Sequence, residues 1–326
     1  MASTIELDGA TKTFDGRTVV ADLSFHVDPG AIVGLIGPSG SGKTTTVRMV
    51  LGVHPPDQGR VLVFGRDPRG FGVAQRQRIG YMPQHFVLYP ELSVEENLDF
   101  MASCYGVSIF HRGRTVKRML DLVELGHVRK RPAGGVSGGE QRRLELACTL
   151  VHDPDLVVMD EPTAGVDPVL RKKFWDHFRA LRDQCRTLLV TTQYVTEAEY
   201  CDQVVALRGG RLAAFGEPDA VRREAMGGDV LRLQAAGLTR QHLDVVARQP
   251  GVAEVVPVGP DEIRITVDDA GQATPRILAA LERDGLSAQN LSEYRPNFDE
   301  VFVRLMEQQD AEPGAPPDGA ARRAAA

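Results

Sequence analysis

Continuous apolar runs mark the first two thirds of this chain. Ala31–Ile36, Leu156–Met159 and Thr187–Val190 are apolar stretches without polar alternation. Strands covered by helices on both faces have this pattern, because both sets of side chains are then buried. We therefore predict three buried parallel strands, with two shorter strand candidates at Arg60–Phe64 and Ile79–Met82.

Helical patterns alternate with these strands. Apolar residues recur at intervals of three and four positions, as they do on one face of an amphipathic helix. The clearest helical segments are Val94–Cys104, Thr115–Leu125, Gly139–Val151 and Val169–Gln184. Short strands followed by helices, from Ile5 to about Ala225, predict a doubly wound α/β core.

The order of elements changes after Gly227 and Gly228, which interrupt the pattern. The following segment predicts strand, helix, strand, strand, helix and strand, which is the ferredoxin-like order. These elements are expected at Val230–Gln234, Thr239–Gln249, Val252–Pro257, Glu262–Val267, Thr274–Asp284 and Ala288–Tyr294, followed by a closing helix at Phe298–Glu307.

These patterns divide the chain into three zones. We predict a large domain over residues 1–226 and a small β-α-β-β-α-β domain over residues 229–307. Residues 308–326 have too few apolar side chains to stabilise an ordered structure, so we expect a disordered tail there. A total of 326 residues suits one large and one small domain.

Composition excludes several classes of protein. No apolar run approaches the roughly 18 residues of a membrane-spanning helix, and the start of the chain does not resemble a secretion signal. The four cysteines are scattered without a Cys-x-x-Cys pair, which favours reduced thiols in the cytosol. A net charge of −6 argues against a general nucleic-acid surface, so we expect no nucleic-acid partner.

A glycine-rich segment lies between the first buried strand and a short predicted helix. GPSGSGKT, from Gly37 to Thr44, matches the phosphate-binding pattern G-x-x-x-x-G-K-[ST]. Its glycines let successive amides point inward, and the helix start adds partial positive charge. Lys43 is expected to reach the β- and γ-phosphates of ATP, and Thr44 to bind Mg²⁺. The predicted nucleotide-binding residues of this segment are Gly37, Pro38, Ser39, Gly40, Ser41, Gly42, Lys43, Thr44 and Thr45.

The segment LVVMDEP, Leu156–Pro162, ends a buried strand with two acids. Asp160 is predicted to hold Mg²⁺ through water, and Glu161 to polarise a water that attacks the γ-phosphate. Two acidic residues after a strand are common in proteins, so this pair by itself is not a specific signal. Together with the glycine-rich segment they indicate one Mg²⁺–ATP site, and we expect the two segments to lie on adjacent strands.

A second candidate phosphate site lies between these two segments, in VSGGEQRR. Gly138 and Gly139 precede a helical run, so Ser137, Gly138, Gly139 and Glu140 surround a second helix start that could bind phosphate. An ordinary phosphate-loop enzyme needs only one phosphate-binding helix start on each chain.

The combination GPSGSGKT, SGGEQ and LVVMDEP, in that order, resembles the ATP-binding subunits of ABC transporters. The resemblance implies a nucleotide-binding domain with a helical subdomain that hydrolyses ATP with Mg²⁺. It also implies that two copies dimerise head to tail. Ser137, Gly138 and Gly139 of one copy would then contact the γ-phosphate held by Lys43 of the other.

The same resemblance assigns roles to single residues. Phe14 falls where the family places an aromatic ring that stacks on adenine, although a core position is the alternative. Gln84, in YMPQ, matches a glutamine that touches Mg²⁺ and the attacking water. Asp167, in AGVD, matches a loop that crosses the dimer interface after the catalytic acid.

Two positions depart from the family pattern. The motif VSGGEQ replaces the commoner LSGGQ, and its Glu140 places an acid in the first turn of a helix, where the helix dipole favours it. Gln193 stands where the family usually has a histidine that contacts the γ-phosphate. A glutamine can donate a hydrogen bond there but carries no charge, and packing at the strand end is the alternative role.

TTQYVTEAE and the later EYRPNFDEVFVRL resemble the daunorubicin-resistance-type branch of exporter ATPases. This branch has a separate membrane permease subunit, which implies a peripheral position at the cytoplasmic face of the membrane. An importer ATPase with a C-terminal regulatory module is an alternative, as is a soluble ABC ATPase of DNA repair or translation. The C-terminal zone could also be a dimer-stabilising appendage without a ligand.

Overall fold

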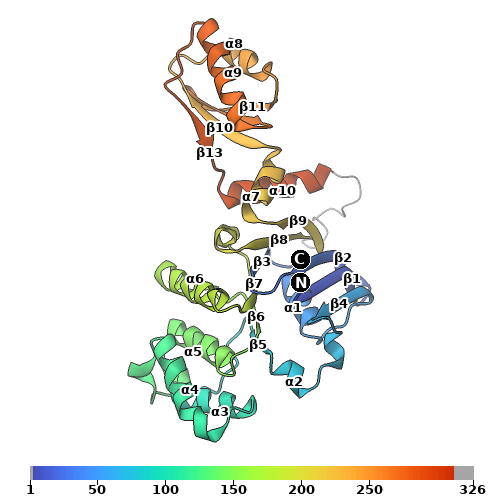
Figure 1. Cartoon of the computed structure of the whole chain (residues 1–326), viewed down its shortest axis with the longest axis vertical. Helices are drawn as coiled ribbons and strands as arrows, with labels where there is room; N and C mark the ends of the chain where they lie inside the picture. Colours follow the sequence, from blue (N-terminus) through green and yellow to red (C-terminus); the bar gives the residue numbers. More distant parts are fainter. Residues whose placement is uncertain (1–2, 312–326) are drawn as a thin grey trace, which may run out of the picture. The chain divides into compact units, whose positions relative to one another are not determined.

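The computed structural model describes residues 3–311 and divides at Gly216 into two compact units (Figure 1). The division falls earlier than the expected domain boundary at residue 226. Helix α7 (Pro218–Met226) packs against α10 (Phe298–Ala311), and Gln308 donates a hydrogen bond to the carbonyl of Ala225, 2.9 Å away. These contacts place α7 with the elements that follow it.

The centre of the first unit is a six-stranded sheet in the order β5-β6-β7-β3-β8-β9. The neighbours from β5 to β8 in this order pair in parallel. Every residue of β3, β6 and β7 is buried, as their unbroken apolar runs predicted. The strands span Ile79–Met82 (β5), Leu156–Asp160 (β6), Thr187–Thr192 (β7), Ile32–Ile36 (β3), Gln203–Arg208 (β8) and Arg211–Gly216 (β9).

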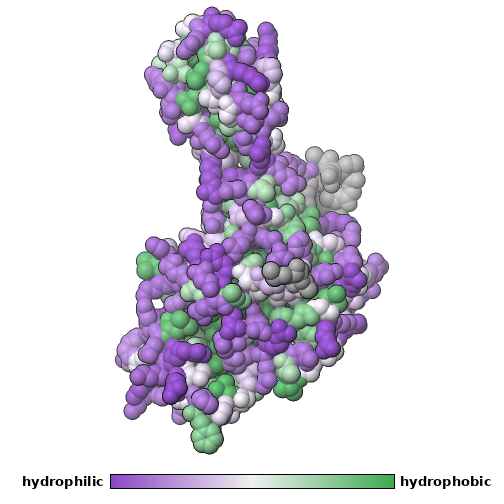
Figure 2. All heavy atoms as spheres, in the orientation of Figure 1, coloured by the Kyte–Doolittle hydropathy of each residue, from purple (hydrophilic) through white to green (hydrophobic). Residues whose placement is uncertain are grey.

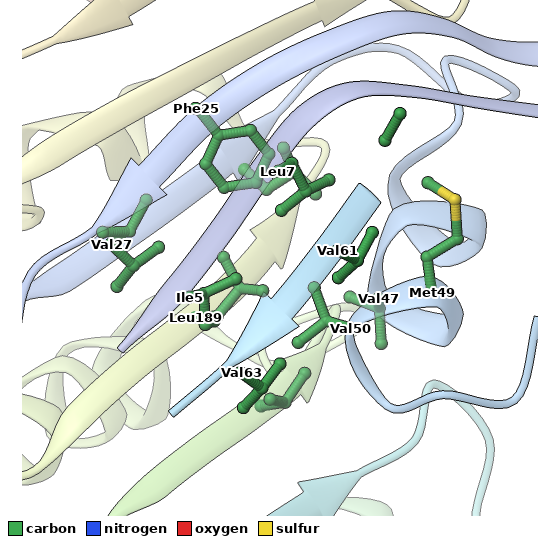
Figure 3. Packing of buried hydrophobic residues seen from close by; sticks show 14 of the residues in the cluster. Ile5, Leu7, Phe25, Val27, Val47, Met49, Val50, Val61, Val63 and Leu189 are labelled. Atoms are coloured by element: carbon green, nitrogen blue, oxygen red, sulfur yellow. The ribbon is translucent and has the colours of Figure 1, made fainter. Parts of the chain in front are cut away.

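A separate antiparallel sheet, in the order β2-β1-β4, covers one part of this unit. It consists of β1 (Ile5–Phe14), β2 (Arg17–Val27) and β4 (Gln58–Val63). Its inner side chains share one hydrophobic core with the central sheet and with α1 (Lys43–Val50), as Figure 3 shows for Ile5, Val47 and Leu189. This core fixes the position of α1, and therefore of the loop that precedes it.

Of the remaining helices of the first unit, α5 (Gly138–Leu150) packs against β5, and α6 (Pro168–Asp183) packs against β3 and β7. Helices α3, α4 and α5 pack on one another and form a group of their own (Figure 1), which is the helical subdomain that the family resemblance implied. The α-helices span Val73–Arg76 (α2), Val94–Cys104 (α3), Ile109–Leu122 (α4), Gly138–Leu150 (α5) and Pro168–Asp183 (α6). Short 3₁₀ turns lie at Pro68–Gly70, Gly126–Val128, Ala133–Gly135 and Val195–Tyr200.

The second unit carries a four-stranded antiparallel sheet in the order β11-β12-β10-β13. Its elements follow the predicted order: β10 (Asp229–Gln234), α8 (Arg240–Ala247), β11 (Val252–Gly259), β12 (Glu262–Val267), α9 (Ala270–Arg283) and β13 (Asn290–Tyr294). Leu231, Ile265 and Ile277 belong to its own core. Helix α10 continues to Ala311, past the expected start of the tail at residue 308, and the rest of that tail lies outside the described residues.

Candidate active site

The predicted phosphate loop connects β3 to α1, the strand-to-helix context that the pattern requires. Gly42 precedes α1 with a φ of 99°, and a Cβ there would lie 2.9 Å from the carbonyl oxygen of Val19. A Cβ on Gly37 would lie 2.5 Å from the carbonyl oxygen of Leu207. Neighbouring strands therefore press against this loop, and only glycine fits at these two positions.

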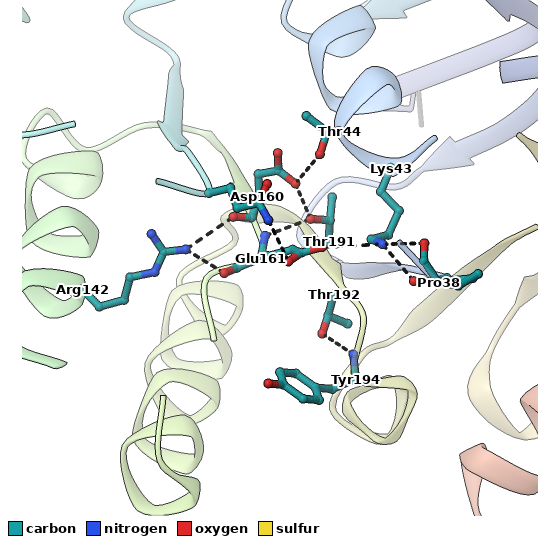
Figure 4. A network of polar contacts seen from close by, with 11 residues as sticks. Pro38, Lys43, Thr44, Arg142, Asp160, Glu161, Thr191, Thr192 and Tyr194 are labelled. Atoms are coloured by element: carbon teal, nitrogen blue, oxygen red, sulfur yellow. Dashed lines mark hydrogen bonds and ion pairs between the residues drawn. The ribbon is translucent and has the colours of Figure 1, made fainter. Parts of the chain in front are cut away.

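Lys43 points back into the loop that precedes it (Figure 4). Its Nζ donates hydrogen bonds to the carbonyl oxygens of Gly37, at 2.8 Å, and Pro38, at 3.2 Å. Burial lowers the pKa of Lys43, while the charges of Glu161 and Asp160 partly offset that effect. A buried ammonium without an anion of its own in the loop is suited to binding phosphate oxygens.

The loop also holds a buried hydroxyl group without a hydrogen-bond partner among residues 3–311. The hydroxyl Oγ of Ser41 makes no hydrogen bond within the described part of the chain, although Ser41 is buried. Unpartnered buried hydroxyls are rare, and a phosphate oxygen in the loop would supply the missing acceptor. Of the other predicted loop residues, Pro38, Ser39 and Gly40 are exposed, and Thr45 lies half-buried in α1.

Asp160 ends β6 beside the phosphate loop. Its Oδ1 accepts a hydrogen bond from Thr191 Oγ1, at 2.6 Å, and a longer one from Thr44 Oγ1, at 3.3 Å. A buried carboxylate beside a threonine hydroxyl fits the predicted Mg²⁺ ligands, since Mg²⁺ in such sites binds few protein oxygens and keeps several waters. Groups of three or more His, Cys, Asp or Glu that could form an all-protein metal site are absent among residues 3–311.

Glu161 follows directly and has an unusual backbone conformation. Its φ is 50°, and its amide donates to Thr191 Oγ1, at 2.9 Å. Its carboxylate lies 3.6 Å from Lys43 Nζ and accepts a 3.1 Å hydrogen bond from Gln84 Nε2. The structure therefore brings Lys43, Thr44, Gln84, Asp160 and Glu161 into one network, partly visible in Figure 4.

The expected adjacency of the two motif strands is wrong. Strand β7 lies between β3 and β6 in the sheet order, so the phosphate loop and Asp160 are two strands apart. The intervening strand supplies Thr191, which hydrogen-bonds to both Asp160 and Glu161. Sequence reasoning missed Thr191, and its position at the carboxyl end of a buried parallel strand is the signal that could have indicated it.

Gln193 is exposed just after β7. Among residues 3–311, no hydrogen bond connects the side chain of Gln193 to the network of the other predicted site residues. Phe14 is 37% exposed, and Lys12 Nζ lies 5.4 Å from the centre of its ring. That exposure is against a core position for Phe14, whose ring also lies 5.2 Å from the ring of His54.

Ser137 begins helix α5 and forms a reciprocal capping box with Glu140. Ser137 Oγ lies 2.7 Å from Glu140 Oε2, and this bond lowers the pKa of Glu140. Gly138 is exposed, and Gly139 is half-buried, at the same helix start. Asp167 caps α6 by accepting hydrogen bonds from the amides of Val169 and Leu170, both at 3.0 Å.

Sequence reasoning also missed Arg142, a buried arginine on α5. It donates to the carbonyl oxygen of Glu161, at 2.6 Å, and to that of Pro162, at 3.0 Å. Arg142 follows the motif SGGEQ in a charged segment, and nothing in that local sequence indicates a buried contact, so only the fold could reveal it.

Comparisons with known proteins agree on one family. A family model described as "ABC transporter" matches residues 20–164. "Nod factor export ATP-binding protein I" of Sinorhizobium fredii is 34% identical over 92% of this chain and 85% of its own length. "Probable multidrug ABC transporter ATP-binding protein YbhF" of Escherichia coli is 36% identical over 93% of this chain. This chain spans about half the length of YbhF, 52%.

A solved structure described as the ATP-binding subunit of an ABC transporter is similar to this chain over about two thirds of its length. The match has a TM-score of 0.63 and 29% sequence identity, and it covers 68% of this chain and 93% of the solved one. Within residues 3–311, no helix is long and apolar enough to cross a membrane.

Proposed function

This chain belongs to the ATP-binding proteins of ABC transporters, and we propose that it hydrolyses ATP to drive export through a separate membrane permease. The observation that carries the proposal is the convergence of Lys43, Thr44, Gln84, Asp160 and Glu161 in one network. These residues lie at or after the carboxyl ends of three strands of one sheet, β3, β5 and β6, the usual place of a ligand site in α/β proteins.

We assign the phosphate loop to ATP binding. Lys43 and the loop amides would bind the β- and γ-phosphates, and the Ser41 hydroxyl would donate its unused hydrogen bond to a phosphate oxygen. The side chains of Thr44, Asp160 and Gln84 would hold Mg²⁺ directly or through water. When bound, Mg²⁺ supplies positive charge that neutralises the phosphate oxygens during transfer. Phe14 would stack on the adenine ring.

Glu161 is the proposed general base. Its carboxylate stands between Gln84 and Lys43, at 3.1 and 3.6 Å, so it can accept a proton from a water placed next to the γ-phosphate. Gln84 would orient that water by its amide. Gln193, at the end of β7, would donate a hydrogen bond to the γ-phosphate in place of the usual histidine.

Replacement of Glu161 by glutamine tests the catalytic assignment. Glu161→Gln keeps the size and shape of the side chain but removes the base. We expect unchanged ATP binding and hydrolysis slowed by about 10²–10⁴-fold, the usual contribution of a general base. Steady-state phosphate release and equilibrium binding of ATP would measure the two effects. Wild-type turnover by this variant would exclude Glu161 as the base.

We further propose that the active form is a head-to-tail dimer of two such chains. Ser137, Gly138, Gly139 and Glu140 surround an exposed helix start, and Asp167 lies at a second one. Both would face the γ-phosphate site or the interface of the other copy, with the amides at the start of α5 directed at phosphate. Bound ATP would then lie between Lys43 of one copy and Ser137 of the other.

Two variants distinguish a one-chain site from a two-chain site. Lys43→Ala should abolish tight ATP binding by the monomer, because the triphosphate loses its cationic partner in a site of reduced dielectric. Ser137→Ala should leave monomer affinity nearly intact and impair hydrolysis and ATP-dependent dimerisation. Affinity measured at low protein concentration and dimer mass measured with ATP would separate them. Equal loss of monomer affinity in both variants would contradict the two-chain site.

Export rather than import is favoured by the relatives, which are named for multidrug transport and Nod factor export. The permease would be a separate polypeptide, and the chain would lie at the cytoplasmic face of the membrane. Exposed apolar side chains on and near the helical group offer a contact surface for it, among them Tyr89, Phe100, Ile109 and Phe110. Figure 2 shows that apolar surface is interrupted by hydrophilic residues on the face in view.

Co-purification with a candidate permease, followed by a search for compounds that stimulate ATP hydrolysis, tests the export proposal. A complex that hydrolyses ATP faster with an exported compound would support it. A complex that instead requires an external binding protein would favour the importer alternative.

We propose that the second unit is a ferredoxin-like domain. Its strand order β11-β12-β10-β13, with every neighbouring pair antiparallel, is the sheet expected for that β-α-β-β-α-β arrangement. A role in stabilising the dimer is favoured over ligand sensing, because no cluster of polar residues converged there in the sequence.

A further inference from the structure

Arg142 holds the backbone on both sides of Glu161. Its Nη2 donates to the carbonyl oxygen of Glu161, at 2.6 Å, and more distantly to that of Asp160, at 3.4 Å. Its Nε donates to the carbonyl oxygen of Pro162, at 3.0 Å. One guanidinium therefore contacts three consecutive carbonyls, and Figure 4 shows it approaching them from the side of α5.

The same guanidinium also reaches the loop that carries Gln84. Nη1 of Arg142 donates to the carbonyl oxygen of Pro83, at 3.0 Å, and to Glu145 Oε2, at 2.7 Å. The other carboxylate oxygen of Glu145 accepts the amide of Val87, at 3.3 Å. The pair of Arg142 and Glu145 thus joins the start of α5 to the segments before and after Gln84.

This pair is buried, so solvent does not screen it. The side chains of Arg142 and Glu145 are 9% and 3% exposed. Each charge is compensated by the other, and the remaining donors of Arg142 are used by backbone carbonyls. An arrangement of this kind fixes geometry, because several hydrogen bonds from one planar guanidinium act on neighbouring backbone groups in a low-dielectric site.

The conformation of Glu161 requires such support. A φ of 50° is uncommon for a residue other than glycine and persists only where the surroundings hold it. The carbonyl of Glu161 is held by Arg142, and its amide is held by Thr191 Oγ1. With both peptide groups fixed, the side chain can leave the backbone in only a few directions. One of them places the carboxylate beside Lys43 and Gln84.

We propose that Arg142 is a positioning residue for ATP hydrolysis, which holds the Glu161 backbone so that the carboxylate meets the attacking water. The proposal rests on the proposed role of Glu161 as general base. Helix α5 would then have two roles, one at its exposed start and one through Arg142. The helix that carries Ser137 at its first turn also holds, within the same chain, the backbone of the catalytic acid.

Arginine is suited to this task and lysine is not. The planar guanidinium presents five donors in a fixed fork, which can serve several carbonyls and one carboxylate at once. A lysine at this position would keep the charge opposite Glu145 but could serve only some of these acceptors. Arg142→Lys therefore separates charge compensation from backbone positioning.

The test uses the full chain with Arg142→Lys. Turnover should fall on the order of 10²-fold, the usual effect of a displaced catalytic group. The affinity for a non-hydrolysable ATP analogue should stay unchanged, because Arg142 touches no residue of the phosphate loop. The matched control is Arg222→Lys in the second unit. Arg222 is also buried, pairs with an acid three residues away, Asp219, and donates to a carbonyl oxygen, that of Pro296. Turnover of this control should equal wild type.

Two further variants separate positioning from simple folding. Glu145→Gln retains Arg142 and its carbonyl contacts, so its turnover should stay within a few-fold of wild type. Arg142→Gln with Glu145→Gln removes both charges, which spares the fold an unpaired buried ion. Its turnover should remain as low as that of Arg142→Lys. Restored turnover in this double variant would overturn the proposal.

A double-mutant cycle with Glu161→Gln completes the test. If Arg142 acts through Glu161, Arg142→Lys should cause no further fall in the slow residual hydrolysis of Glu161→Gln, since the base is already lost. An equal further fall, or wild-type turnover by Arg142→Lys, would overturn the inference. Failure of the proposed function looks different, because the wild-type chain itself would then release no phosphate from ATP.

Discussion

Asp160 and Glu161, the two acids of LVVMDEP, are neighbours in the chain but have different surroundings. Asp160 is 1% exposed and shares its Oδ1 between two threonine hydroxyls, which suits a fixed Mg²⁺ ligand. Glu161 is turned by its left-handed backbone toward Lys43 and Gln84. These different environments are the reason for proposing metal binding for Asp160 and proton acceptance for Glu161.

Gln193 gives a prediction at the scale of one residue. If its amide donates to the γ-phosphate, Gln193→Ala should slow hydrolysis on the order of 10²-fold, as the loss of one donor aimed at developing charge does. Gln193→His should retain activity and acquire a pH dependence near the unperturbed imidazole pKa of about 6.5.

Steady-state hydrolysis by the three proteins across pH would measure these effects, with the wild type showing no such dependence from this position. An alanine variant as fast as wild type, with the same pH profile, would leave Gln193 a structural residue at the strand end.

The bounds of some elements follow from local signals in the sequence, and those of others are hidden by local irregularity. Helix α3 has the predicted bounds, Val94–Cys104, because a capping box of Ser93 and Glu96 fixes its start. Strand β1 went unpredicted because its pairing with β2 shifts register several times, so its side chains do not alternate regularly between the two faces. Helix α4 begins at Ile109, before the predicted start at Thr115, since Gly113 and the charged residues around it obscure the period.

His152, just after α5, gives a prediction at this scale. Its ring stacks on Tyr105 at 3.7 Å, and its Nε2 lies 3.2 Å from the carbonyl oxygen of Ile79. Its Nδ1 is buried and has no hydrogen-bond partner among the described residues. Burial lowers the pKa of His152 below its ordinary value of 6.5. The unfolded chain therefore binds more protons than the folded chain in the range from 6.5 down to the lowered pKa, and the free energy of unfolding falls as pH falls through this range.

His152→Phe should keep the stacking and remove this titration. The variant should lose less stability than wild type between pH 7 and pH 5.5, measured by denaturant unfolding at both pH values. Its stability at pH 7 should be somewhat lower, because the bond to Ile79 is lost. His177, whose pKa burial also lowers, stays in both proteins and so cancels in the comparison. An identical loss for both proteins would contradict a buried neutral His152.

At the scale of the whole molecule, each unit has a core of its own. The core that contains Ile5, Val47 and Leu189 shares no side chain with the core that contains Leu231, Ile265 and Ile277. We predict that residues 1–215 and residues 216–311, expressed separately, each fold, since each buries its own hydrophobic residues. The first fragment should bind ATP as tightly as the full chain.

Circular dichroism with heating, and binding of a fluorescent ATP analogue, would check these two outcomes. A fragment that ends at residue 226 serves as the comparison, because it retains α7 without its partner α10 and should be less stable than the fragment that ends at 215. Loss of ATP binding by residues 1–215 would show that the second unit contributes to the nucleotide site.

The sequence by itself determined the parts whose chemistry is local. The glycine-rich loop, the two acids at the end of β6 and the buried parallel strands follow from residue types at fixed spacing, because a loop that binds phosphate needs glycines before a helix start. Only the tertiary structure decided which strands are neighbours. It placed β7 between β3 and β6, brought Thr191 to both acids, and turned Arg142 inward from a charged run. These contacts join residues that are far apart in the chain, and the spacing of residues within one segment does not predict which distant side chains will contact it.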